Sequence, residues 1–248
     1  MSKMYHEDRF ICKKDMEWIN NGEENALNKK RRFMILAVVL LLLLLGIGII
    51  IALLGVRHTK SSRLKDKSPK EYPIFHSSVD KDQDGMDDEA DMLQGTLDYI
   101  NTRPKYKSKY YNSGYPDDDY GVCTDVVANA CLAAGYDLMA LVSADIASDP
   151  EAYGIEKPDP NIDFRRVRNL RVYFKRHAAE LTTDLTDHEA WQGGDIVIFK
   201  SHIGIVSDRR NAHGVPYVIH HSSPQQIRYE QDILEKRDDL VGHYRISE

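Results

Sequence analysis

A run of 23 residues without a charge, Phe33 to Gly55, constrains this chain more than any other feature. At about 1.5 Å per residue, a helix of that length spans the roughly 30 Å hydrocarbon core of a bilayer. A buried helix of a soluble domain is disfavoured because the run has no polar face. A cleaved signal is disfavoured because the run is too long and begins 32 residues into the chain. We predict a single transmembrane helix at residues 33–55.

The orientation of this helix depends on the basic residues beside it. Six Lys and Arg side chains lie within 20 residues on each side, so the positive-inside rule alone gives a tie. Residues 29–32 are four contiguous basic residues that adjoin the helix, and long domains translocate with little regard to their own charge. We therefore expect residues 1–32 to be a cytoplasmic tail and the later domain to be extracytoplasmic.

The part after Gly55 is acidic, with 25 basic and 33 acidic side chains. It has no basic stripe, which argues against nucleic acid as a partner. Residues 56–78 are basic and contain Ser and Pro, as expected of a juxtamembrane linker. Cys123 and Cys131 are eight residues apart, about 12 Å along one helix, whereas a disulfide needs Cα atoms within about 7 Å. We expect a free thiol at Cys123.

The spacing of apolar residues predicts helices first and strands afterwards, which is typical of an α+β domain with an antiparallel sheet. The expected helices cover residues 88–102, 124–134, 137–147 and 165–180. The expected strands cover residues 195–199, 202–206, 216–220 and 241–245, with turn residues at 208–214.

One cysteine and two later histidines have the order that thiol catalysis needs. Cys123 lies at the expected start of a helix, where the helix N-terminus and a nearby imidazolium would lower the thiol pKa. If strands 202–206 and 216–220 pair with 206 opposite 216, His202 lies opposite His220. His202 would then take the thiol proton, and His220 would orient it. Alternatively, each of the three is an ordinary structural residue.

Several motifs, taken in order, resemble a bacterial family of unknown function that is related to the NlpC-type, papain-like peptidoglycan hydrolases. The resemblance covers roughly residues 90–246 and rests on five segments: 121–126, 157–167, 194–197, 202–208 and 242–245. It implies a papain-like α+β fold with Cys123 as nucleophile, His202 as base and His220 as the third polar residue. It also implies an envelope location and cell-wall peptides as substrates.

Two features depart from that family. The insert between Cys123 and His202 is long, and His221 follows His220 where relatives tend to have Asn. Strand alternation sends neighbours to opposite faces, so we expect only one of the two histidines to face His202, and we choose His220. In the insert, a charged peptide would be bound by Asn161, Asp163, Arg165 and Arg166. The alternative there is a solvated helix start that is capped by Asp163.

A second motif, at residues 80–91, has the spacing of a calcium-binding loop. Gly85 occupies the sixth position, where the chain must turn sharply. The loop resembles dockerin-type and other extracellular calcium loops, although position 12 is Asp rather than Glu. The alternative is an acidic disordered linker. We predict a structural Ca²⁺ site with ligands from Asp80, Asp82, Asp84, Met86, Asp88 and Asp91.

Together these features predict a membrane-anchored cysteine amidase or endopeptidase, with a hydrolase domain at residues 92–248 after a calcium loop at 79–91. It would cleave amide bonds of peptidoglycan peptides through an acyl-enzyme on Cys123, with the Cys123 backbone N–H as oxyanion donor. Two alternatives remain open: a binding module for cell-wall peptides or a protein, without turnover, and an acyltransferase or transpeptidase.

Overall fold

The computed structural model describes residues 27–51 and 59–246, and their contacts divide the chain into two units, Met1–Val56 and Arg57–Glu248. In the first unit, the described helix Leu27–Ile51 is long and apolar enough to cross a membrane. It includes the six residues before the predicted span, so the basic residues at 29–32 are helical as well. The last part of that span, 52–55, and most of the predicted tail, 1–26, lie outside the described residues, as does Cys12.

The second unit has the predicted α+β composition. Its helices are α2 (Asp88–Asn101), α3 (Cys123–Ala133), α4 (Leu138–Ser148), α5 (Pro150–Tyr153), α6 (Pro160–Asp163), α7 (Val167–His177), η1 (His188–Ala190) and η2 (Leu234–Lys236). Its strands are β1 (Lys105–Tyr106), β2 (Tyr120–Gly121), β3 (Ala179–Glu180), β4 (Ile196–Phe199), β5 (Ile203–Arg210), β6 (Pro216–Ile219), β7 (Glu230–Gln231) and β8 (Leu240–Arg245).

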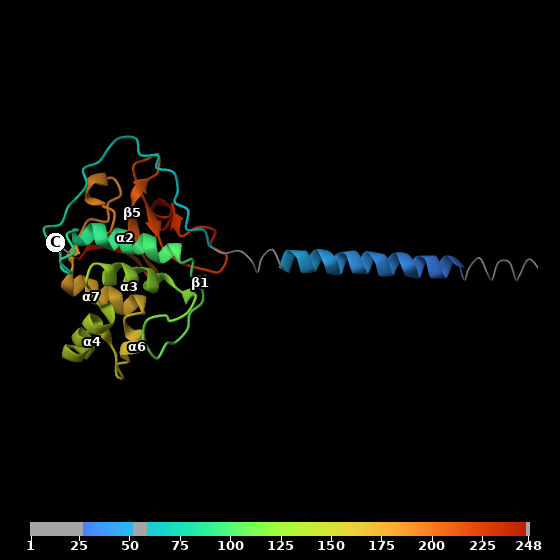
Figure 1. Cartoon of the computed structure of the whole chain (residues 1–248), viewed down its shortest axis with the longest axis horizontal. Helices are drawn as coiled ribbons and strands as arrows, with labels where there is room; N and C mark the ends of the chain where they lie inside the picture. The colour runs from blue at the N-terminus through green and yellow to red at the C-terminus, as the bar shows by residue number, and fades with distance from the viewer. Residues whose placement is uncertain (1–26, 52–58, 247–248) are drawn as a thin grey trace, which may run out of the picture. The chain divides into compact units, whose positions relative to one another are not determined.

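The strands form an antiparallel six-stranded sheet in the order β3-β8-β4-β5-β6-β7. Helices α2 and α3 pack on each other and on β5, while α4, α6 and α7 lie on the far side of α3 (Figure 1). This arrangement places the first residue of α3 against the middle of the sheet.

The central strands are apolar on both faces. Ile196, Ile198 and Ile205 join the core beneath the helices, whereas Val197 and Val206 join a smaller cluster around Trp191 on the other face. Because both faces are covered, β4 and β6 are buried along their whole length and do not show a polar alternation.

The segment expected as a juxtamembrane linker is bound to the domain from its first described residue. We call residues 59–79 the strap. Thr59 Oγ1 donates to the carbonyl of Gln226 (3.1 Å), and the Lys67 N–H donates to the carbonyl of Arg210 (2.9 Å). Arg63 forms an ion pair with Glu230 (2.9 Å), whose side chain is fully buried. The strap is therefore part of the folded unit, and the acidic loop that follows it leads directly into α2.

Candidate functional site

Cys123 is the first residue of α3 and is half-buried. The helix begins here because the Asp125 carboxylate accepts a hydrogen bond from the backbone N–H of Val122 (2.8 Å). Cys131 lies on the same helix and is fully buried in the core. Both thiols are free, which confirms the prediction for Cys123. The structure therefore places the Cys123 thiol at a helix N-terminus and keeps Cys131 away from solvent.

A buried ion pair holds the start of α3 in place. The Arg165 guanidinium binds both carboxylate oxygens of Asp125, at 2.6 Å and 2.9 Å, and it also donates to the Lys109 carbonyl (2.8 Å). Thr124 Oγ1 donates to the carbonyl of Arg165 (3.3 Å). The insert between Cys123 and His202 thus returns to support the candidate nucleophile.

This finding changes the interpretation of the four insert residues expected to bind a peptide. Arg165 is buried and committed to Asp125, and buried Asp163 accepts from the Asp159 N–H (2.6 Å) and pairs with Arg166 (3.0 Å). Neither is available to a ligand. Asp163 is also not the expected cap of the helix predicted at 165–180, because Asp163 is the last residue of α6 and the N-cap residue of α7 is Arg166. Asn161 and Arg166 keep exposed surface, so a role in substrate binding stays a prediction for these two alone.

His202 and His220 are in direct contact, with Nε2 of His202 2.9 Å from Nδ1 of His220. The assumed register was wrong by two residues: Val206 pairs with Val218 rather than with 216, because a bulge lies between Val206 and Arg210. The contact is diagonal, and it passes Gly204, where a Cβ atom would lie only 3.1 Å from the His220 Cβ. The predicted pair of imidazoles is therefore present.

His221 lies in the same cluster, contrary to the expected alternation. Strand β6 ends at Ile219, so residues 220 and 221 are outside regular β structure and need not point to opposite faces. The His221 ring stacks edge-on against Tyr106 (5.2 Å) and Tyr229 (5.0 Å) and is fully buried. Three buried imidazoles therefore lie near one another, just before the start of β5 and just after the end of β6.

Burial governs the protonation of this site. It lowers the pKa of His202 to about 4, with help from Arg237 and against Asp239. Burial and the nearby His202 lower the pKa of His220 to about 3 and that of His221 to about 4. Burial raises the pKa of Cys123 to about 11, although the backbone N–H of Ile203 lowers it. The expectation of a depressed thiol pKa is contradicted, because at neutral pH the imidazoles carry no charge to stabilise a thiolate.

These shifts predict loss of stability in acid. The unfolded histidines take up protons below about pH 6.5, whereas the folded ones resist until about pH 4, so stability falls as the pH falls through that interval. Each imidazole contributes about 1–2 kcal/mol of this loss between pH 7 and 5. His221→Phe removes one titrating group and fills the space between two tyrosine rings.

We expect urea unfolding of the full chain in detergent to show a shallower decline from pH 7 to 5 for His221→Phe than for the wild type. The other titrating groups contribute equally to both proteins, so they do not affect the difference between the two slopes. The change in the free energy of unfolding from pH 7 to 8, where the histidines titrate little, serves as the internal control. Equal slopes from pH 7 to 5 would show that His221 is not held neutral by its surroundings.

Comparison with known proteins places this domain in a family. Residues 93–246 match the model of a domain of unknown function, DUF1287. The chain belongs to the DUF1287 family. It is 37% identical over 151 residues to the uncharacterized protein YijF of Escherichia coli (strain K12), a match that covers 57% of this chain and 72% of YijF. No solved structure matches the chain significantly.

The DUF1287 match contains a second buried network that sequence reasoning missed. Asp195 binds His243 Nε2 (2.8 Å) and Arg245 Nε (2.8 Å), and the His243 ring stacks on Trp191 at 3.8 Å. These side chains join β4 to β8 far from the surface. The Gly-Asp and Gly-His-Tyr-Arg motifs of this DUF1287 chain therefore have a structural role. The sequence does not reveal this role, because Asp195 binds residues that lie about 50 positions later in the chain.

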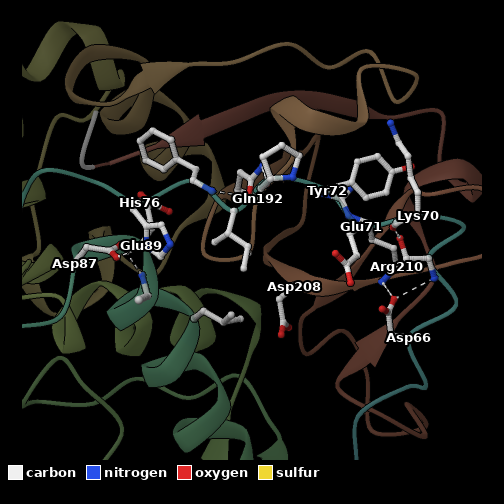
Figure 2. A pocket seen from close by; sticks show the side chains of 17 residues that line it. Asp66, Lys70, Glu71, Tyr72, His76, Asp87, Glu89, Gln192, Asp208 and Arg210 are labelled. Carbon is white, nitrogen blue, oxygen red and sulfur yellow. Dashed lines mark hydrogen bonds and ion pairs between the residues drawn. The ribbon is translucent and has the colours of Figure 1, made fainter.

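A cavity of about 470 Å³ lies beneath the strap. Most of the residues that line it precede residue 93, where the DUF1287 match begins. Figure 2 shows Asp66 beside Arg210 and Gln192 beneath the strap. Asp66 accepts from the Arg210 N–H (2.9 Å), and Gln192 Nε2 donates to the Pro73 carbonyl (3.1 Å). Neither Cys123 nor the histidine cluster lines this cavity. It results from the docking of the strap and is separate from the candidate catalytic centre.

The acidic loop also precedes the DUF1287 match. Ligand oxygens of Asp80, Asp82 and Asp84 lie within 4.8 Å of one another. Gly85 has φ +97°, the left-handed conformation that the sixth position of such a loop requires. Asp88 is used within the fold, since its carboxylate accepts from the Lys81 N–H (2.8 Å) and from the Tyr136 hydroxyl. Burial and the carboxylates of Asp84, Asp82, Asp88 and Asp80, in that order, raise the pKa of Asp91 to about 6.

Proposed function

We propose that this DUF1287 protein is a membrane-anchored cysteine hydrolase that cleaves amide bonds in peptidoglycan peptides. The observation that carries the proposal is the 2.9 Å contact between His202 Nε2 and His220 Nδ1. The next residue after His202 is Ile203, and its backbone N–H forms a hydrogen bond with the Cys123 thiol. A nucleophile, a base and a group that orients the base are the three parts of a catalytic triad.

The chemistry follows from which atoms are already in use. The His220 contact uses Nε2 of His202, so Nδ1 is the ring nitrogen that takes the Cys123 proton. Because thiol and imidazole are both neutral at pH 7, proton transfer accompanies attack of sulfur on the amide carbonyl. His202 then gives that proton to the leaving amine, and a water molecule that it activates releases the acyl group from sulfur. The Cys123 N–H at the start of α3 supports the oxyanion.

The choice of substrate rests on the resemblance to papain-like peptidoglycan hydrolases, which also favours a papain-like arrangement of α3 and β5. An apolar helix at residues 27–51 supports a membrane anchor. The basic residues 29–32 support a cytoplasmic N-terminus and an extracytoplasmic domain. Half-buried Asn161 and exposed Arg166 are the candidates for contacts with a charged peptide.

The test is turnover of defined muropeptides by the full chain in detergent, followed by mass spectrometry of products and of the intact protein. New free amines and an acyl adduct on Cys123 are expected. Products that form only when an amine acceptor is added would assign a transferase instead. Retention of muropeptides with no product and no adduct would overturn the hydrolase proposal in favour of a binding module.

A further inference from the structure

Asp91 is a buried acidic residue with one carboxylate oxygen that lacks a hydrogen-bond partner among the described residues. Its side chain is only 6% exposed, and its Oδ2 atom has no hydrogen-bond partner among the described residues. A buried carboxylate oxygen without a partner costs free energy unless a proton or a cation satisfies it. Asp91 occupies position 12 of the acidic loop, the position that supplies the last carboxylate ligand in a calcium-binding loop.

The other end of the loop offers the remaining ligands. The oxygens of Asp80, Asp82 and Asp84 converge within 4.8 Å. The backbone already donates to all three side chains: the Gly85 N–H to Asp80 (3.0 Å), the Asp84 N–H to Asp82 (3.3 Å) and the Met86 N–H to Asp84 (2.8 Å). These bonds fix the carboxylates in place without neutralising them. We propose that residues 80–91 bind one Ca²⁺ through Asp80, Asp82, Asp84, the Met86 carbonyl and Asp91.

Asp88 has a supporting role in this site. Its carboxylate is held by the Lys81 N–H and the Tyr136 hydroxyl, so it orients the loop rather than binding the ion directly. This differs from the sequence prediction, which counted Asp88 as a ligand. Oxygen ligands alone, with one backbone carbonyl and several carboxylates, suit Ca²⁺ better than Mg²⁺, which keeps most of its water.

The bound ion would join three parts of the domain. The Asp88 N–H donates to the carbonyl of Val79 at the end of the strap (3.0 Å). Lys81 Nζ lies 4.4 Å from the centre of the Tyr136 ring, and a Cβ atom on Gly135 would be 3.2 Å from the Asp82 Cβ. The loop therefore rests on the turn after α3, and Ca²⁺ would fasten the strap and α2 to the end of the helix that begins at Cys123.

The test is the melting temperature of the full chain in detergent, with EDTA or with 5 mM Ca²⁺ or Mg²⁺. With a dissociation constant of about 10⁻⁴–10⁻³ M, Ca²⁺ is expected to raise the melting temperature by about 3–8 °C. Asp91→Asn should lose this shift and, in EDTA, melt no lower than the wild type, because it removes an unpaired buried charge. Asp98→Asn, an exposed carboxylate on α2, should keep the shift.

A second readout locates the ion. Tb³⁺ emission excited through tyrosine is expected from the wild type, because Tyr136 touches the loop, and Ca²⁺ should displace it. Emission should be lost in Asp84→Asn. The proposal would be overturned by a wild type that shows neither a Ca²⁺ shift nor Ca²⁺-sensitive emission, or by an equal shift with Mg²⁺. Neither readout depends on turnover, so the result is independent of the proposed hydrolase activity.

Discussion

Replacing Cys123 with alanine is expected to lower the proposed turnover of peptidoglycan peptides by at least about 10³-fold, because the proposed acyl-enzyme forms on this thiol. Cys131→Ala is the matched control, since it removes a thiol from the same helix at a fully buried core position. It should keep turnover near the wild-type level and lower only the melting temperature. Rates would be compared on the same muropeptides at pH 7 for the full chains in detergent.

A Cys123→Ala protein that still released amines at the wild-type rate would remove Cys123 from the mechanism. Loss of turnover in both cysteine variants, with both proteins folded, would mean that α3 packing rather than the thiol limits the reaction. His202→Ala completes the comparison. It should abolish the acyl adduct on Cys123 without unfolding the domain, since the imidazole is uncharged at neutral pH.

Replacing Arg165 with methionine is expected to destabilise the domain by about 3–5 kcal/mol, because it leaves the Asp125 carboxylate buried without a counter-charge. Urea unfolding of the full chain in detergent measures this loss. Arg166→Met is the control: Asp163 is also buried, but Arg166 is 44% exposed and Asp163 keeps its hydrogen bond from the Asp159 N–H (2.6 Å), so we expect a smaller loss, of about 1–2 kcal/mol.

The double variant Asp125→Asn with Arg165→Met distinguishes the contribution of the two charges to stability from the contribution of side-chain packing. Because both charges are gone, it should recover much of the stability that Arg165→Met alone loses. Equal destabilisation by Arg165→Met and Arg166→Met would contradict the assignment of Arg165 as the group that holds α3. Turnover should fall with Arg165→Met, since Asp125 also fixes the Val122 N–H beside Cys123.

Local patterns were sufficient to predict most of the regular elements. Helices expected at 88–102 and 124–134 are α2 and α3 within one residue at each end, because their apolar residues recur at helical spacing and cap signals stand at their starts. The four expected strands are β4, β5, β6 and β8, whereas the two-residue strands β1, β2, β3 and β7 were not expected. The helix predicted at 165–180 is shorter, at Val167–His177, because α6 forms its own capped turn before it.

The site was less predictable wherever distant residues decide the geometry. The His202–His220 contact was anticipated, but its register depended on a bulge that no turn residue marks. The Asp125–Arg165 pair joins residues 40 positions apart, so Arg165 looked like an exposed ligand of a peptide. Burial of Cys123 and the histidines comes from tertiary packing, and therefore their pKa values could not be read from sequence.

The strap has a practical consequence for expressing the domain alone. The family match begins at residue 93, but the buried carboxylate of Glu230 is paired with Arg63 from the strap. The Gln226 carbonyl accepts a hydrogen bond from the Thr59 hydroxyl, and the Gln226 side chain donates to the His220 carbonyl (2.9 Å). A fragment that begins at residue 93 would leave the Glu230 carboxylate buried without its counter-charge. It would also remove the Thr59 hydrogen bond that holds Gln226 next to His220. The folded unit therefore includes the chain from Thr59 onward, and inactivity of a shorter fragment would not count against the proposed hydrolase.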